Sequence, residues 1–144
     1  MSESRPSLFI VDGSVDVTGA LVSAARQAEL LKDELDTILV LSSFHRVPPE
    51  RTTAFAEVLT SPFVSPRKRI VHAILYLPGL LVSALQLRRA MRRRGSRLLQ
   101  LNDFYLLHGA VLRLLGFGGR IVTFVRIDPT RYGVIGRWWL KAAR

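Results

Sequence analysis

The sequence contains no cysteine, which excludes disulfide bonds, thiolate zinc sites and cysteine nucleophiles. The absence fits a reducing compartment, and the residues before Ser7 are too polar for a secretory signal. We therefore expect a cytoplasmic protein. The three histidines show no metal-ligand spacing, so we predict no metal site and no bound cofactor.

Acidic residues are scarce in the second half of the chain. Residues 1–66 carry five Lys or Arg and nine Asp or Glu, whereas residues 67–144 carry sixteen and two. No acid occurs between Glu57 and Asp103. This polarity indicates an anionic partner for the second half, which could be a phosphate-bearing ligand, an anionic lipid or a nucleic acid.

Short apolar runs alternate with amphipathic segments along the 144 residues, of which 49% are hydrophobic. This length and composition predict a single domain, 1–144, with a packed core. The alternation predicts an α/β fold with a Rossmann-like, doubly wound parallel sheet. The expected strands are 7–12, 36–42, 97–101 and 120–125, with a short edge strand between Ser61 and Pro66. The expected helices are 20–32, 49–59, 67–94, 104–116 and 131–144.

Polar residues follow the predicted strands at the points where ligands bind in open α/β sheets. Asn102 and Asp103 follow one strand, and Arg126 and Asp128 follow the next. Ligands of such sheets lie at the carboxyl ends of the strands. We therefore expect the working edge there, although Asp103 can equally cap the next helix, which we favour. Gly19 opens a helix after the first strand, in the geometry that receives a phosphate, or in a plain tight connection.

The segment 67–94 contains eighteen uncharged residues, Ile70 to Leu87, between two basic clusters. Its length could just cross a bilayer, but Pro78-Gly79 at its centre and cations at both ends argue against a span. We favour a kinked helix packed on the sheet, which is compatible with a second face lying on an anionic membrane. The cations that would face the membrane are Arg67, Lys68, Arg69, Arg88, Arg89, Arg92, Arg93 and Arg94.

Three further side chains, His108, Trp138 and Trp139, could either pack in the core or have a functional role. His108 lies within an apolar segment, and we predict that it is a hydrogen-bonded core residue. The neighbouring Trp138 and Trp139 suit a bilayer or domain interface, but at helical spacing both cannot point the same way, so one can face the core.

The order of these segments resembles the amino-terminal domain of GT-B glycosyltransferases of the glycosyltransferase 4-like family. The similar stretches are Leu8-Phe-Ile-Val-Asp12, the helix from Gly19, Ser96-Arg-Leu-Leu-Gln-Leu-Asn-Asp103 and Leu114-Leu-Gly-Phe-Gly-Gly-Arg-Ile-Val-Thr-Phe124. The resemblance covers nearly the whole chain and rests on order and spacing. It departs after the last strand, where the family commonly has a histidine.

The resemblance implies an acceptor-binding half of an enzyme that moves a sugar from a nucleotide-sugar co-substrate to a saccharide or lipid-linked acceptor. It would place Gly19 beside the donor phosphates, and Asn102 and Asp103 at the rim of the acceptor cleft. Arg126 and Asp128 would be the catalytic candidates at the reaction centre.

In that family a donor-binding domain follows this one, so we expect the chain alone to be inactive. The donor-binding domain would come from the same chain or from a separate subunit. The protein would then be cytoplasmic and peripheral on the inner face of the membrane, acting on an envelope saccharide. One alternative is a non-catalytic membrane-associated adaptor subunit. Another is a basic nucleic-acid-binding domain, which we disfavour because no recognition motif is present.

Overall fold

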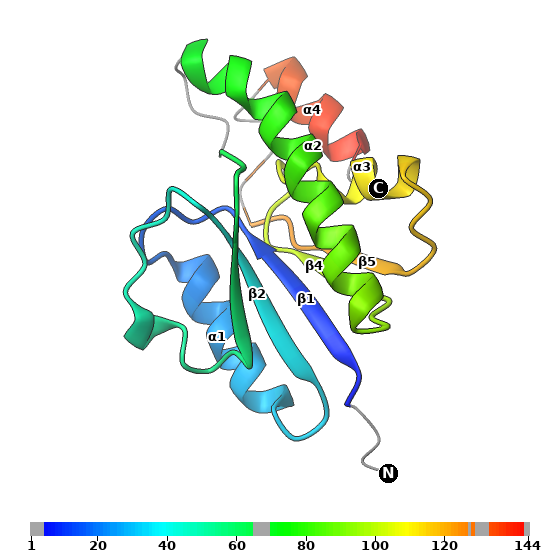
Figure 1. Ribbon diagram of the computed structural model, residues 1–144. Helices are drawn as coiled ribbons and strands as arrows, with labels where there is room; N and C mark the ends of the chain where they lie inside the picture. The colour runs from blue at the N-terminus through cyan, green and yellow to red at the C-terminus, as the bar shows by residue number, and fades with distance from the viewer. Residues whose placement is uncertain (1–4, 65–69, 127, 129–132, 143–144) are drawn as a thin grey trace.

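The computed structural model describes residues 5–64, 70–126, 128 and 133–142. Five parallel strands form one sheet in the order β3-β2-β1-β4-β5 (Figure 1). The strands are β1 (Ser7–Asp12), β2 (Asp36–Ser42), β3 (Glu57–Ser61), β4 (Leu98–Leu101) and β5 (Arg120–Thr123). Helix α1 (Gly19–Leu31) covers one face, and α2 (Ile70–Arg93) and α3 (His108–Leu114) cover the other. The predicted Rossmann-like, doubly wound α/β fold is confirmed.

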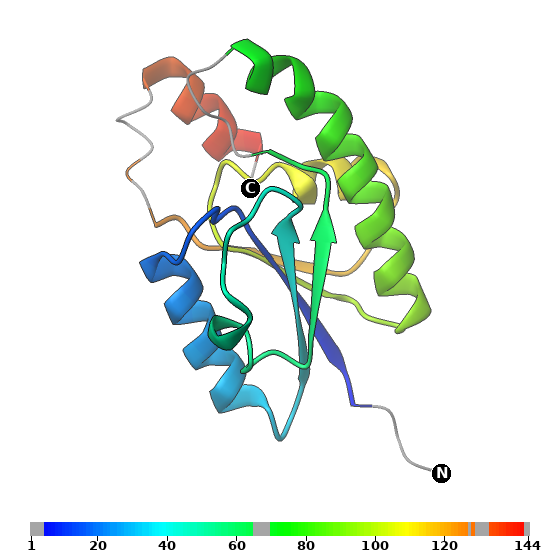
Figure 2. The ribbon, with the colours of Figure 1, turned by 60° about the vertical axis from the view of Figure 1, so that its left-hand side comes forward.

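The central strands are buried on both faces because helices cover both sides of the sheet. In β1, Leu8 and Ile10 pack towards α1, whereas Phe9 and Val11 pack towards α2 and α3. This explains the nearly continuous apolar run of the strand, which is typical of parallel sheets. The helix α4 (Gly133–Ala142) lies beyond the carboxyl ends of the strands in both views (Figures 1 and 2).

The predicted helix over 49–59 is wrong. Only a 3-10 turn, Pro49–Arg51, forms there, and the chain then enters β3. Leu59 of β3 pairs in parallel register with Val40 of β2. The edge strand therefore precedes the Ser61–Pro66 segment in which the sequence placed it. Proline at the start of a segment favours only its first turn, and the pairing with β2 determined the rest.

The helix α2 packs on the sheet, as the sequence predicts. Its buried positions are Leu80, Ser83, Ala84, Leu87 and Met91. Gly79 lies against the loop after β3, where an added Cβ would approach the carbonyl oxygen of Pro62 to 2.4 Å. Within the described residues, no helix combines the length and the apolar character that a membrane crossing requires.

His108 is a buried, hydrogen-bonded core residue, which confirms the prediction. Its Nε2 lies 2.9 Å from the hydroxyl of Ser83, and its ring meets that of Phe63 edge-on at 4.7 Å. Its Nδ1 is buried and has no hydrogen-bond partner among the described residues. Burial lowers the pKa of His108 to about 3, so the ring stays neutral in the core.

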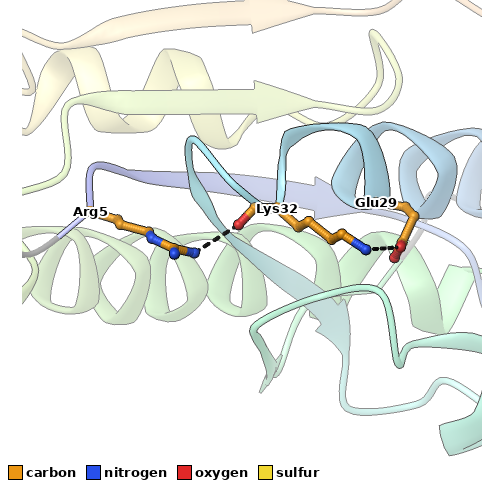
Figure 3. A network of polar contacts seen from close by, with 3 residues as sticks. All are labelled: Arg5, Glu29 and Lys32. Atoms are coloured by element: carbon orange, nitrogen blue, oxygen red, sulfur yellow. Dashed lines mark hydrogen bonds and ion pairs between the residues drawn. The ribbon is translucent and has the colours of Figure 1, made fainter.

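At the amino end of the sheet, surface contacts tie the segment before β1 to the end of α1 (Figure 3). Arg5 donates to the carbonyl oxygen of Lys32 at 2.9 Å, and Lys32 pairs with Glu29 at 2.6 Å. The Glu29 carboxylate raises the pKa of Lys32. Both side chains of the pair are exposed, so the contact orients the segment more than it stabilises the fold.

Candidate functional site

The order of the sheet reverses between β1 and β4. The chain adds β2 and β3 on one side of β1 and then returns to add β4 and β5 on the other. At such a switch point the connections leave in opposite directions, which opens a crevice at the carboxyl ends of the two strands. Asp12 ends β1 and Asn102 follows β4, so the two residues lie side by side at this point.

Asp12 and Asn102 form a buried hydrogen-bonded pair. The Asn102 Nδ2 donates to Asp12 Oδ2 at 2.5 Å and to the carbonyl oxygen of Ala20 at 3.3 Å. The second carboxylate oxygen of Asp12 accepts from the N–H of Ser14 at 2.7 Å. Both carboxylate oxygens of Asp12 are thus engaged, and the pair joins β1, β4 and α1. Asp12 therefore shapes the site, and its neutral hydrogen-bond donors hold the carboxylate in place without removing its negative charge.

Two glutamines extend this network along the face that α1 covers. Gln100 Nε2 donates to Asn102 Oδ1 at 3.2 Å, and the side-chain amides of Gln100 and Gln27 exchange hydrogen bonds at 2.9 and 3.0 Å. The network fixes which way the Asn102 amide points. Neither glutamine was predicted from the sequence, although a polar residue in the apolar run Leu98–Leu101 is a signal that indicates a buried polar network.

Arg126 reaches this cluster from the segment after β5. Its Nη2 lies 3.4 Å from Asn102 Oδ1 and 3.5 Å from the Ser23 hydroxyl, and its guanidinium covers the ring of Phe124 at 5.2 Å. These polar contacts are long for hydrogen bonds, and the side chain is exposed. A guanidinium has five donors, so most of its capacity is available to an anionic ligand.

Asp103 is buried next to Asn102, close enough to Arg126 for the charge of the guanidinium to act on its carboxyl. Burial raises the pKa of Asp103, while the N–H groups of Phe104 and Arg126 and the guanidinium charge oppose that rise. Its Oδ1 accepts from the N–H of Phe104 at 2.8 Å. Capping of the next helix, which we favoured, is wrong, because α3 begins only at His108, after Leu107. A carboxylate oxygen of Asp103 can also accept a hydrogen bond from a ligand hydroxyl.

The first turn of α1 completes the cluster. The Thr18 hydroxyl accepts from the N–H of Leu21 at 3.2 Å and lies 2.6 Å from the Ser14 hydroxyl. Gly19 starts the helix, and a Cβ there would meet no atom within 4 Å. The surface at Gly19 is therefore open, and nothing in the described structure demands glycine for steric reasons.

The structure thus brings four of the predicted site residues into one cluster: Gly19, Asn102, Asp103 and Arg126. Asp128 is exposed beyond it. Among the predicted membrane-facing cations, Arg67, Lys68 and Arg69 lie outside the described residues. The other five occupy the carboxyl-terminal turns of α2 and the residue after it, at the opposite end of the sheet. In the part of the chain that the structure describes, no three His, Asp or Glu side chains gather as a metal site.

No protein-family model matches this chain, and no curated protein matches it in sequence. Among solved structures, a mutant PPC decarboxylase complexed with pantothenoylaminoethenethiol is similar in fold, with a TM-score of 0.50 and 11% sequence identity. The match covers 98% of this chain and 79% of the decarboxylase chain. At this identity the likeness shows the Rossmann-like fold alone.

The resemblance to GT-B glycosyltransferases is wrong. The solved structure described above is a decarboxylase and not a glycosyltransferase, and no family match supports a glycosyltransferase. The stretches that carried the resemblance are an apolar strand, a small-residue loop and an amphipathic helix, repeated in order. Any doubly wound parallel sheet needs these features, so their order identifies the fold and not the family.

Proposed function

We propose that the carboxyl edge at the β1–β4 switch point binds a phosphorylated, hydroxyl-bearing small molecule, such as a nucleotide or a sugar phosphate. The observation that carries this proposal is the position of Arg126. Its exposed guanidinium lies against Asn102 and the second turn of α1, while its own contacts are long. A buried network already orders the groups around it, so little order has to be created on binding.

Each part of such a ligand has a matching group in the cluster. A phosphate suits the Arg126 guanidinium, which forms paired hydrogen bonds with oxyanions. Ligand hydroxyls suit Asp103, because a further hydrogen-bond donor would stabilise its buried carboxylate. The Phe124 ring, partly exposed beneath Arg126, offers a flat apolar surface.

Calorimetric titration of the protein with ADP, ribose 5-phosphate and adenosine tests this function. We expect both phosphorylated compounds to bind, and Arg126→Gln to weaken each about tenfold, because one charged contact is lost. The matched control is Arg120→Gln, which removes an exposed arginine at the other end of β5 and should leave the affinity unchanged. Equal binding of adenosine, or an unchanged affinity of Arg126→Gln, would contradict the proposal.

Sugar transfer from a nucleotide sugar to an envelope acceptor stays a prediction from the sequence and forms no part of this proposal. A nucleotide sugar belongs to the proposed ligand class only through its phosphates and hydroxyls.

Peripheral contact with an anionic membrane is a second candidate, which the outer face of α2 supports. Leu77, Leu81 and Leu85 follow one another at four-residue spacing and are 67%, 49% and 36% exposed. Arg88 and Arg92 continue the same helix face towards its carboxyl end. Exposed leucines followed by cations suit a helix lying in the headgroup layer of an anionic bilayer.

Sedimentation with vesicles tests this second candidate. We expect binding to phosphatidylglycerol vesicles and not to phosphatidylcholine vesicles, and about tenfold weaker binding for Leu77→Gln/Leu81→Gln. Leu30→Gln is the control, because Leu30 is 84% exposed on α1, which covers the opposite face of the sheet. Equal losses in both variants, or equal binding to both vesicles, would exclude a membrane-specific role for α2.

A further inference from the structure

A second basic site lies at the opposite end of the sheet, where β4 and β5 begin. We call it the arginine pocket. It is a hollow of about 140 Å³ between the carboxyl-terminal turns of α2 and the loop before β5. Its lining includes three arginines and a glycine-rich loop, namely Arg88, Arg92, Arg97 and Gly116–Gly119.

The three arginines of the pocket carry charges that the described residues do not neutralise. No carboxylate lines the pocket, and no ion pair with Arg88, Arg92 or Arg97 occurs among the described residues. Their neighbour Arg94 differs, because it pairs with Glu57. Three like charges around one small hollow repel one another, and an anion placed among them would remove that repulsion.

The loop that closes the pocket is held in place by contacts of its own. Arg113 donates from Nη1 to the carbonyl oxygens of both Phe117 and Gly119 at 2.7 Å. Gly116 has a φ of +80°, which favours glycine. At Gly119 an added Cβ would lie 2.4 Å from the carbonyl oxygen of Arg97. The wall of the pocket is therefore fixed before any ligand arrives.

The Arg88 side chain lies beside this loop. It is half-buried, and its Nη2 lies 3.6 Å from where a Cβ of Gly116 would be. A Cβ at Gly116 would thus be in ordinary van der Waals contact with the guanidinium. Arg92 and Arg97 are exposed and approach from α2 and from the start of β4. Cations from two separate segments can contact different oxygens of one tetrahedral group.

We propose that the arginine pocket binds a phosphoryl oxyanion. The site is separate from the carboxyl-edge cluster, because it lies at the amino ends of β4 and β5 and shares no residue with that cluster. It does share Arg88 and Arg92 with the α2 face considered above for membrane contact. The phosphoryl group can belong to a free phosphorylated molecule or to a phospholipid headgroup, since both present the same oxygens to the guanidinium groups.

The test compares two double variants of equal charge. Arg88→Gln/Arg97→Gln changes the pocket, whereas Arg89→Gln/Arg93→Gln removes two exposed arginines of α2 that do not line it. Inorganic phosphate is titrated into each ¹⁵N-labelled protein at constant ionic strength, and the amide shifts of Gly116–Gly119 are followed. Saturable wild-type binding, weakened at least tenfold in the pocket variant and less than twofold in the control, is expected.

Equal weakening in both variants would overturn the proposal, because it would mean diffuse attraction by the basic surface. Absence of saturable phosphate binding to the wild type would overturn it as well. Unchanged circular dichroism and thermal midpoints show that the variants are folded, which is expected at exposed and half-exposed positions.

Vesicles containing phosphatidylglycerol then distinguish the two sources. If the pocket variant loses affinity for phosphate and for vesicles, the group is a lipid headgroup. If it loses affinity for phosphate alone, the group belongs to a free molecule. Both results support a phosphoryl site, and neither depends on whether ADP binds at the carboxyl edge.

Discussion

The polar groups at the two ends of the sheet differ in burial and in pairing. At the carboxyl end, Asp12 and Asn102 are buried and satisfy each other within a continuous network. At the amino end, Arg88, Arg92 and Arg97 surround a hollow without a carboxylate partner among the described residues. A buried polar group without a hydrogen-bond partner is costly, so such groups pair inside the protein. An exposed cation is solvated by water and remains available to a ligand.

This difference separates residues that build a site from residues that receive a ligand. The Asp12–Asn102 pair holds three elements together, and its removal should damage the fold before it damages binding. The guanidinium groups contribute little to the fold, and their removal should damage binding alone. Arg126 combines the two situations, since its guanidinium touches the network but remains exposed.

The largest expected effect follows from breaking the buried pair. Asp12→Ala leaves the Asn102 amide and the N–H of Ser14 without their acceptor, and should lower the free energy of unfolding by about 3 kcal/mol in urea denaturation. The control Asp16→Ala removes only an exposed ion pair with Arg46 and should change it by less than about 0.5 kcal/mol. Similar losses for both variants would mean that the network does not stabilise the fold.

His108 is a buried titratable group at the carboxyl end of the sheet, and its burial should make the stability depend on pH. Its pKa of about 3 lies below the ordinary 6.5, so the unfolded chain binds a proton more readily than the folded protein. Stability should therefore fall as the pH drops from 6.5 towards 3, by up to about 1.4 kcal/mol per pH unit from this group.

The variant His108→Gln keeps a polar group that can reach Ser83 but does not titrate. Urea denaturation at pH 7 and pH 5 should show a smaller loss of stability on acidification in the variant than in the wild type. An identical pH dependence in the two proteins would show that His108 does not stay neutral on folding.

Asp103 should show a smaller effect with the opposite sign. Its pKa is raised on folding, so its contribution is full below the ordinary value of 3.8 and is lost as the pH rises through the folded value. The wild type should therefore lose stability relative to Asp103→Asn between pH 4 and pH 7, as measured by the two urea midpoints. A relative gain of the wild type over this range would mean that hydrogen bonds and Arg126 outweigh burial.

The smallest effect is expected at the amino end. Arg92→Gln removes an exposed cation that forms no ion pair with the described residues, and should change the free energy of unfolding by less than about 0.5 kcal/mol. If removal of this charge raises the free energy of unfolding, the increase should be smaller in 1 M salt, because salt screens the repulsion among the arginines. A loss of more than about 1 kcal/mol would mean that Arg92 has a structural role and would weaken the contrast between the two ends.

The sequence predicted what depends on local pattern. The apolar run of β1 and the capped helix after it fell where expected, because each encodes its own period and boundaries. Predictions from the sequence were wrong where pairing with a distant strand determined the secondary structure. Leu59 belongs to a strand only because β2 lies beside it, and no local signal distinguishes that stretch from a helix.

The candidate site was predictable in position but not in detail. Strand-end polar residues pointed to Asn102, Asp103 and Arg126, since parallel strands end at one edge. The glutamine pair Gln27–Gln100 spans 73 residues of sequence, so only the fold could bring it together. The arginine pocket likewise needs Arg88 and Gly116 from two elements, and in the sequence its cations belonged to one undivided basic cluster.

The most direct test of the account is a pair of titrations of the ¹⁵N-labelled protein, one with ADP and one with inorganic phosphate at equal ionic strength. We predict that ADP shifts the amide signals of Gly19, Asn102 and Arg126 in a saturable way. We predict that inorganic phosphate shifts those of Gly116–Gly119. ADP that leaves the three carboxyl-edge amides unmoved at saturating concentration would contradict the proposed function.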